Sequence, residues 1–242
     1  MENKNSTTDQ EKSQSNSEQL DKTKSFLQKS ATNTKDLVTA AFLLAVIILL
    51  SLTPLGFVRL PLLPELTILH VPVIIGSILL GLKYGAFLGF AFGMSSFLNA
   101  TFAPGLISFA FSPYYSVGDI HGNAWSLVVA FLPRILVGIT PWLAYKGLGR
   151  LLKFKGSDSI SLAVSGVVGS LTNTIIVLGL IGIFFTKEFS TLMGTTSGLL
   201  FKGILGIVAT NGIPEAILAG VITVAVCKAV LISQKRLNNN KS

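Results

Sequence analysis

Five polar side chains interrupt the long apolar stretches of this sequence, and their chemistry is the most informative feature of the chain. Arg134 lies in FLPRILVG, Glu215 lies in TNGIPEAIL, and three amides, Asn99, Asn173 and Asn211, occur in similar surroundings. A charge among apolar residues is costly to bury, so it indicates a partner or a function. A guanidinium beside several amides would suit a solute with an anionic group and other hydrogen-bonding groups. A structural ion pair between Arg134 and Glu215 is the alternative.

The elements that must position these residues are membrane-spanning helices. Half of the residues are hydrophobic, mean hydropathy is +0.66, and only 12% are charged, whereas soluble domains have about 25% charged residues. A spanning helix needs roughly 20 apolar residues, and the chain has room for six. We therefore expect an all-α, polytopic protein of the cell membrane with six transmembrane helices in one bundle. The spans are expected at about 37–58, 66–82, 84–102, 124–145, 160–185 and 199–232.

Two of the polar residues fall deep in these spans. Arg134 lies about ten residues into the fourth span, so at ~1.5 Å per residue it is ~15 Å deep, near the midplane of the membrane. Glu215 lies at a comparable depth in the last span. That span is too long to cross perpendicularly, so it must tilt, kink at Gly212-Ile213-Pro214, or include a segment outside the bilayer.

The distribution of basic residues predicts the orientation. With both termini inside, 15 of the 19 Lys and Arg residues lie on the inner side, Arg134 lies within the membrane, and only Arg59, Lys187 and Lys202 lie outside. This asymmetry predicts an N-in, C-in topology. The net charge of +8 is therefore attributed to orientation and to attraction by anionic lipid rather than to nucleic acid.

The flanks differ from the hydrophobic part in composition. Residues 1–35 are rich in Ser, Asn, Gln, Lys and Glu, so we expect a disordered polar cytoplasmic tail. Residues 36–232 are expected to form the six-helix solute-binding domain, and residues 233–242 a second cytoplasmic tail.

Several classes of function are disfavoured by the sequence. It contains no G-x-x-x-x-G-K-[S/T] phosphate loop, so no ATPase activity of its own is expected. A single cysteine, Cys227, and two distant histidines, His70 and His121, make a metal site improbable, and no cofactor is expected. The sequence also offers no nucleophile and base pair for a membrane enzyme. A structural membrane scaffold is a further alternative.

The connection at 103–123 is long and aromatic. Tyr114 and Trp125 could close over a solute as a lid, or they could belong to an interfacial aromatic belt. Lys202, nearer the outer mouth, is an alternative cation for an anionic solute, although it could equally extend its ammonium to the interface.

Small residues recur at helical spacing in two places. Gly81, Gly85, Gly89 and Gly93 form a stripe at the start of the third span, which predicts close packing with another helix of the bundle. Ala41 and Ala45 form a weaker pair on the first span.

These features, taken together, resemble the substrate-binding S component of an energy-coupling factor vitamin transporter, most closely the branch that includes pantothenate and pyridoxine-type binders. The resemblance covers about residues 36–232 and includes Ala41-x-x-x-Ala45. Its further segments are LHVPVIIG at 69–76, LGLKYG at 80–85, PRILVG at 133–138, GSLTNT at 169–174 and NGIPEA at 211–216.

The resemblance implies a subunit that binds a water-soluble vitamin from outside for ATP-driven uptake. A membrane coupling subunit and two cytoplasmic ATPases would be its partners, and the coupling subunit would dock at Ala41 and Ala45. Pantothenate is the best guess for the vitamin, with Arg134 or Lys202 pairing with its carboxylate. A self-contained secondary transporter, with Glu215 as a proton relay, is the alternative function.

Overall fold

The structure is a computed structural model that describes residues 34–53, 56–58, 66–152, 154, 156–192, 194 and 197–239. The chain divides into two units, Met1–Ala41 and Phe42–Ser242. Of the first unit, the described part is the beginning of a helix, Thr34–Ser51. The disordered tail predicted for 1–35 therefore lies outside the described residues, apart from two helical residues at its end. The described part of the predicted C-terminal tail continues the last helix.

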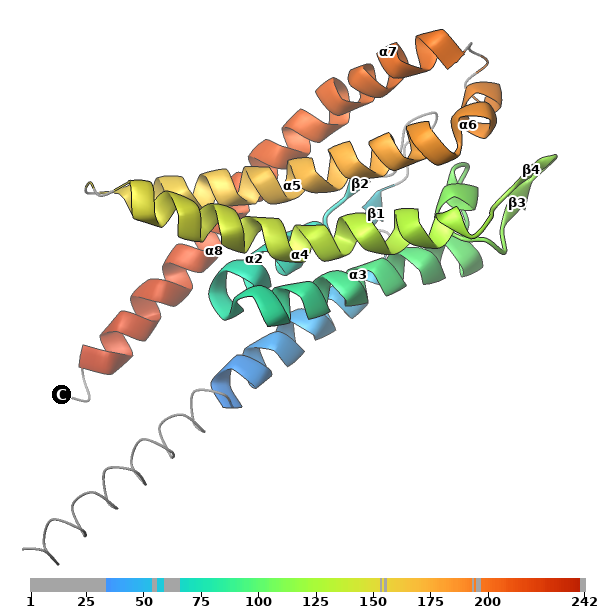
Figure 1. The fold of residues 1–242 in the computed structure, drawn as a ribbon. Helices are drawn as coiled ribbons and strands as arrows, with labels where there is room; N and C mark the ends of the chain where they lie inside the picture. The colour runs from blue at the N-terminus through green and yellow to red at the C-terminus, as the bar shows by residue number, and fades with distance from the viewer. Residues whose placement is uncertain are drawn as a thin grey trace, which may run out of the picture. The chain divides into compact units, whose positions relative to one another are not determined.

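Five helices within the described residues are long and apolar enough to cross a membrane, which confirms the polytopic all-α class. They are Thr34–Ser51, α3 (Leu82–Phe102), α4 (Trp125–Leu151), α5 (Ser157–Phe184) and the stretch Lys202–Ser233. Figure 1 shows α3, α4 and α5 running side by side, and α4 contacts both α3 and α5. The inside and outside assignment remains a prediction.

The segment predicted as the second span, 66–82, is only partly helical. Leu66–Thr67 form strand β2, which pairs antiparallel with β1 (Phe57–Val58), and α2 covers His70–Leu80. At ~1.5 Å per residue its 11 residues extend about 16 Å, less than the hydrocarbon thickness. The expectation that a helix fills 66–82 is therefore wrong, and a count of six full spans is not confirmed.

The last hydrophobic stretch changes from an α-helix to a π-helical turn just before its proline. It consists of α7 (Ser197–Ile207), a π-helical turn η2 (Val208–Gly212) and α8 (Ile213–Asn239). The N–H of Ile213 donates to the carbonyl of Val208, five residues earlier. Pro214 follows at once and has no N–H to continue the regular helical ladder, so a wider turn is expected there.

Short elements occupy the two longer connections. Residues 103–124 contain a 3-10 turn, η1 (Ser108–Ala110), and a hairpin of β3 (Ser116–Val117) and β4 (Ile120–His121). A seven-residue helix, α6 (Thr186–Leu192), lies between α5 and α7.

The glycine stripe is the seam between α3 and α4, as predicted for three of its four members. A methyl group added at Gly85 would collide with the carbonyl of Gly138, and one at Gly89 with the carbonyl of Arg134. At Gly93 it would come within 2.9 Å of the Phe131 ring. The fourth member, Gly81, has a different role: its φ of 87° lies where glycine is favoured, and it forms the corner between α2 and α3.

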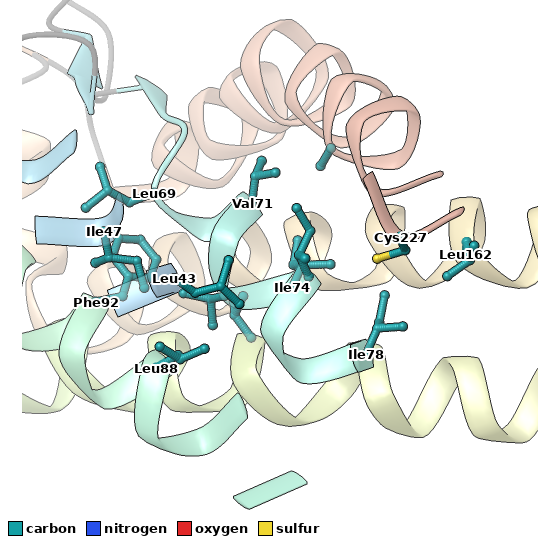
Figure 2. Close-up of a cluster of buried hydrophobic side chains, with 14 residues drawn as sticks. Leu43, Ile47, Leu69, Val71, Ile74, Ile78, Leu88, Phe92, Leu162 and Cys227 are labelled. Carbon is teal, nitrogen blue, oxygen red and sulfur yellow. The ribbon is translucent and has the colours of Figure 1, made fainter. Parts of the chain in front are cut away.

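The apolar core of residues 42–239 includes a cluster around α2, shown in Figure 2. Val71, Ile74 and Ile78 of α2 belong to this cluster together with Leu88 of α3 and Cys227 of α8. Nine of the 11 residues of α2 are buried, so this helix is surrounded by protein rather than by lipid. A second cluster joins α5, α6 and α7 to η1.

Candidate solute site

A single cavity brings together the five polar residues that the sequence marks out. Arg134, Glu215, Asn99, Asn173 and Asn211 all line it, although they come from α3, α4, α5, η2 and α8. The empty volume of the cavity, including the space at its open mouth, is about 800 Å³. The centre of a water molecule fits into only about 80 Å³ of this volume. The cavity is therefore narrow, and a solute in it must contact the walls closely.

Arg134 is held in place by its own helix. Its Nη1 donates to the backbone carbonyl of Val129 at 2.8 Å, and the side chain is only 5% exposed. Residue 133, four residues after Val129, is a proline inside α4 and has no N–H to donate to that carbonyl. The guanidinium therefore bonds to a carbonyl that the helix itself leaves unsatisfied.

Two aromatic rings flank the same guanidinium. Its central carbon lies 5.4 Å from the ring centre of Phe92 and 4.8 Å from that of Phe111. Attraction between a cation and the face of a ring is stronger where water is excluded. Phe92 is a buried residue of α3, whereas Phe111 comes from the connection after α3 and also lines the cavity.

Side-chain bonds at both ends anchor the connection that carries Phe111. Thr101 Oγ1 and Ser112 Oγ are 2.8 Å apart, and Ser126 Oγ donates to the carbonyl of Phe109 at 2.7 Å. Within the connection, the Gly105 N–H donates to Ser108 Oγ at 2.8 Å. Ser108 therefore reaches the cavity wall from a segment tied to both α3 and α4.

Glu215 interacts with the backbone and not with Arg134. Its Oε1 accepts the N–H of Thr67 at 2.9 Å, and Thr67 is itself buried and lines the cavity. Among the described residues, Arg134 and Glu215 thus share one cavity without an ion pair between them. The charge of each is met by other contacts.

Three polar atoms at the cavity have no hydrogen-bond partner among the described residues. They are Asn173 Oδ1, Asn211 Nδ2 and Ser96 Oγ, all buried. Buried polar groups in proteins nearly always have partners, so such atoms indicate positions where a ligand or water binds. They present an acceptor, a donor and a hydroxyl.

Part of the wall could not be recognised from the sequence. Thr67, Ser96, Ser108, Phe111 and Thr174 are polar or aromatic residues that line the cavity without having been selected as candidates. Serine and threonine are frequent in membrane helices, where they pair with their own backbone, so their type carries little signal. Phe111 lies in the aromatic connection, and that composition was the available signal. The apolar wall consists of Val177, Leu178, Ile181 and Ile207 together with Ala100, Ala103 and Ile107.

Three of the predicted solute contacts lie elsewhere. Tyr114 is 78% exposed and lies beside the Phe97 ring, at a centroid distance of 6.3 Å. Trp125 is half exposed and stacks on Phe184, with centroids 4.2 Å apart. Lys202 is exposed on α7. None of these three side chains is part of the cavity wall as described.

A cavity with a cation, a carboxylate and three amides, enclosed by apolar spanning helices, defines a membrane-embedded protein that binds a small polar solute. The sequence from residue 35 to 227 matches the model of the family described as "ECF transporter, substrate-specific component". The chain belongs to this family. It is the substrate-specific subunit of an energy-coupling factor importer, and a multi-pass protein of the plasma membrane.

Two characterised relatives are similar over most of their lengths. One, from Lactococcus lactis subsp. cremoris, is named "Pantothenic acid transporter PanT" and is 43% identical over 165 residues, which cover 68% of this chain and 76% of the relative. The other, from Leuconostoc mesenteroides subsp. mesenteroides, is named "Pantothenate transporter PanT". It is 34% identical over 207 residues, covering 84% of this chain and 95% of the relative.

Proposed function

We propose that this chain binds pantothenate from outside the cell and holds it in the cavity described above for ATP-driven uptake. The proposal is based on the names of the two relatives and on the chemistry of the wall. Pantothenate has a carboxylate, an amide and two hydroxyls on a small body. The observation that carries the proposal is that Arg134 lines one cavity together with Asn173 and Asn211, two amides that each have an atom without a hydrogen-bond partner among the described residues.

Each group of the solute has a counterpart in the wall. Arg134 pairs with the carboxylate, because a guanidinium presents its N–H donors in the planar arrangement that a carboxylate accepts. The Asn173 oxygen accepts from a hydroxyl or from the amide N–H, and the Asn211 nitrogen donates to the amide carbonyl or to a hydroxyl. The branched hydrocarbon part packs against Val177 and Leu178.

Uptake requires partners, because the family supplies only the substrate-specific component of a transporter. We expect a membrane coupling subunit and two cytoplasmic ATPase subunits. The coupling subunit is proposed to dock at Ala41 and Ala45, both of which are exposed. Leu44 and Ile48 of the same helix line an apolar groove of about 720 Å³ together with Phe90 and others. Small residues next to an apolar groove allow another helix to approach closely.

Calorimetry on the purified protein with a panel of vitamins tests the solute. The decisive variants are Arg134→Gln and Lys202→Gln, which remove a cation inside the cavity and an exposed cation outside it. Arg134→Gln is expected to weaken pantothenate binding by about 2–5 kcal/mol, and Lys202→Gln to leave it unchanged. If a neutral or cationic vitamin binds tightly and pantothenate does not bind, pantothenate is not the solute. Unchanged binding by Arg134→Gln refutes the carboxylate contact.

A further inference from the structure

The Glu215 carboxylate joins two parts of the cavity wall that are far apart in the chain. Its Oε1 accepts the Thr67 N–H at 2.9 Å across a sequence separation of 148 residues. On one side of this bond is the beginning of α8, directly after the π-helical turn that carries Asn211. On the other side is the end of β2, and Thr67 itself faces the cavity.

The residues directly after Thr67 are tied to the surrounding structure by hydrogen bonds and by burial. Thr67 Oγ1 accepts the N–H of Leu69 at 3.3 Å, and the N–H of Ile68 donates to the carbonyl of Gly56 at 3.3 Å. Leu69 and His70, at the beginning of α2, are almost completely buried. A displacement of Thr67 must therefore move both the base of the β1–β2 hairpin and the first turn of α2.

We propose that Glu215 is a positioning residue that fixes Thr67 against α8 and thereby controls how long the solute stays in the cavity. This inference rests on the proposed binding of pantothenate in the same cavity. The donor is a backbone N–H, and a carboxylate oxygen can only accept. Residue 215 therefore needs a hydrogen-bond acceptor at the end of a side chain as long as glutamate. Its negative charge matters less for this bond.

Two substitutions separate reach from charge. Glu215→Gln keeps an acceptor at the same distance and removes the charge, whereas Glu215→Asp keeps the charge and withdraws the acceptor by one methylene. We expect pantothenate to dissociate from Glu215→Gln within about threefold of the wild-type rate, and from Glu215→Asp and Glu215→Ala about tenfold faster, as the loss of one hydrogen bond predicts. Ile217→Ala, an exposed position on the same helix, is the matched control and should change nothing.

Hydrogen–deuterium exchange of the Thr67 amide in solute-free protein provides a readout that does not depend on the vitamin. Exchange should be about tenfold faster in Glu215→Asp and Glu215→Ala and nearly unchanged in Glu215→Gln. The proposal would be overturned if pantothenate dissociated fast from Glu215→Gln and at the wild-type rate from Glu215→Asp. That result would assign Glu215 a direct charge contact or a proton-transfer role. Unchanged exchange in Glu215→Ala would also overturn it. If pantothenate fails to bind the wild type, the proposed solute is wrong, and the exchange experiment alone decides the role of Glu215.

Discussion

The α-carbon of Gly89 lies against the backbone carbonyl of Arg134, so closely that a single methyl group at Gly89 would collide with the oxygen. The seam between α3 and α4 therefore includes the backbone of the residue whose side chain carries the positive charge of the cavity. The position of the guanidinium depends on how closely these two helices approach.

Gly89→Ala should lower the free energy of unfolding by about 1–3 kcal/mol, because α3 and α4 must separate to admit the methyl group. It should also weaken solute binding. Gly179→Ala is the matched control, since no atom of the described residues lies within 4 Å of the added methyl group. An alanine is normally favoured over glycine in a helix by roughly 0.5–1 kcal/mol, so the control should be stabilised. Thermal unfolding in detergent measures the stability of both variants. Equal shifts of the unfolding temperature in the same direction would contradict the close packing of α3 against α4 at Gly89.

Pro133→Ala should weaken solute binding by about tenfold, the equivalent of one hydrogen bond to a charged group. The alanine supplies an N–H that competes with Arg134 for the carbonyl of Val129. Pro141→Ala makes the same chemical change two turns later in α4 and should leave binding largely intact. Calorimetry on the two variants measures the difference. If both variants bind normally, Pro133 has no part in positioning the guanidinium.

Asn173→Leu should stabilise the solute-free protein and weaken solute binding by about 1–3 kcal/mol. The two effects have opposite signs because the Oδ1 atom has no partner among the described residues until a solute provides one. Ser170→Ala removes a buried hydroxyl that also has no partner in the described part of the chain but does not line the cavity. It should stabilise the protein without affecting binding. Loss of stability in Asn173→Leu would show that the amide is structural.

Ala45→Trp should leave solute binding intact and abolish uptake, since an indole ring would prevent close approach of a partner helix. Ile183→Trp, at an exposed apolar position of α5, is the control and should support uptake. Binding by the purified subunit and uptake by cells with the complete transporter are measured in parallel. A variant that loses both activities would point to a role of Ala45 in folding.

The predicted orientation can be read from cysteine accessibility. Cys227 is buried, so a single introduced cysteine dominates the reaction with an impermeant maleimide. Asp158→Cys, at the beginning of α5, should be shielded in intact cells, and Thr191→Cys, in α6, should react. Both positions are exposed to solvent or lipid in the structure. The reverse pattern would invert the topology.

Sequence reasoning was most reliable where one physical effect dominates. Apolar length predicted the spanning helices, and the cost of burying a charge or an amide identified Arg134, Asn173 and Glu215 as cavity residues. It failed at 66–82, because β-branched and apolar residues fit a short strand and a buried helix equally well. It could not separate the two readings of Tyr114 and Trp125, which do not line the described cavity, since an aromatic side chain at a membrane surface has the same composition signal in a lid and in a belt.

Residue 134 performs its two roles with different atoms. The carbonyl belongs to the helix seam and would be present with any side chain, whereas the guanidinium belongs to the cavity and can be exchanged while the seam is kept. In a lineage of such subunits, the charge offered to the solute can therefore change by single substitutions on a backbone that stays the same. Ligand preference can diversify within this architecture without a search for a new way to pack the helices.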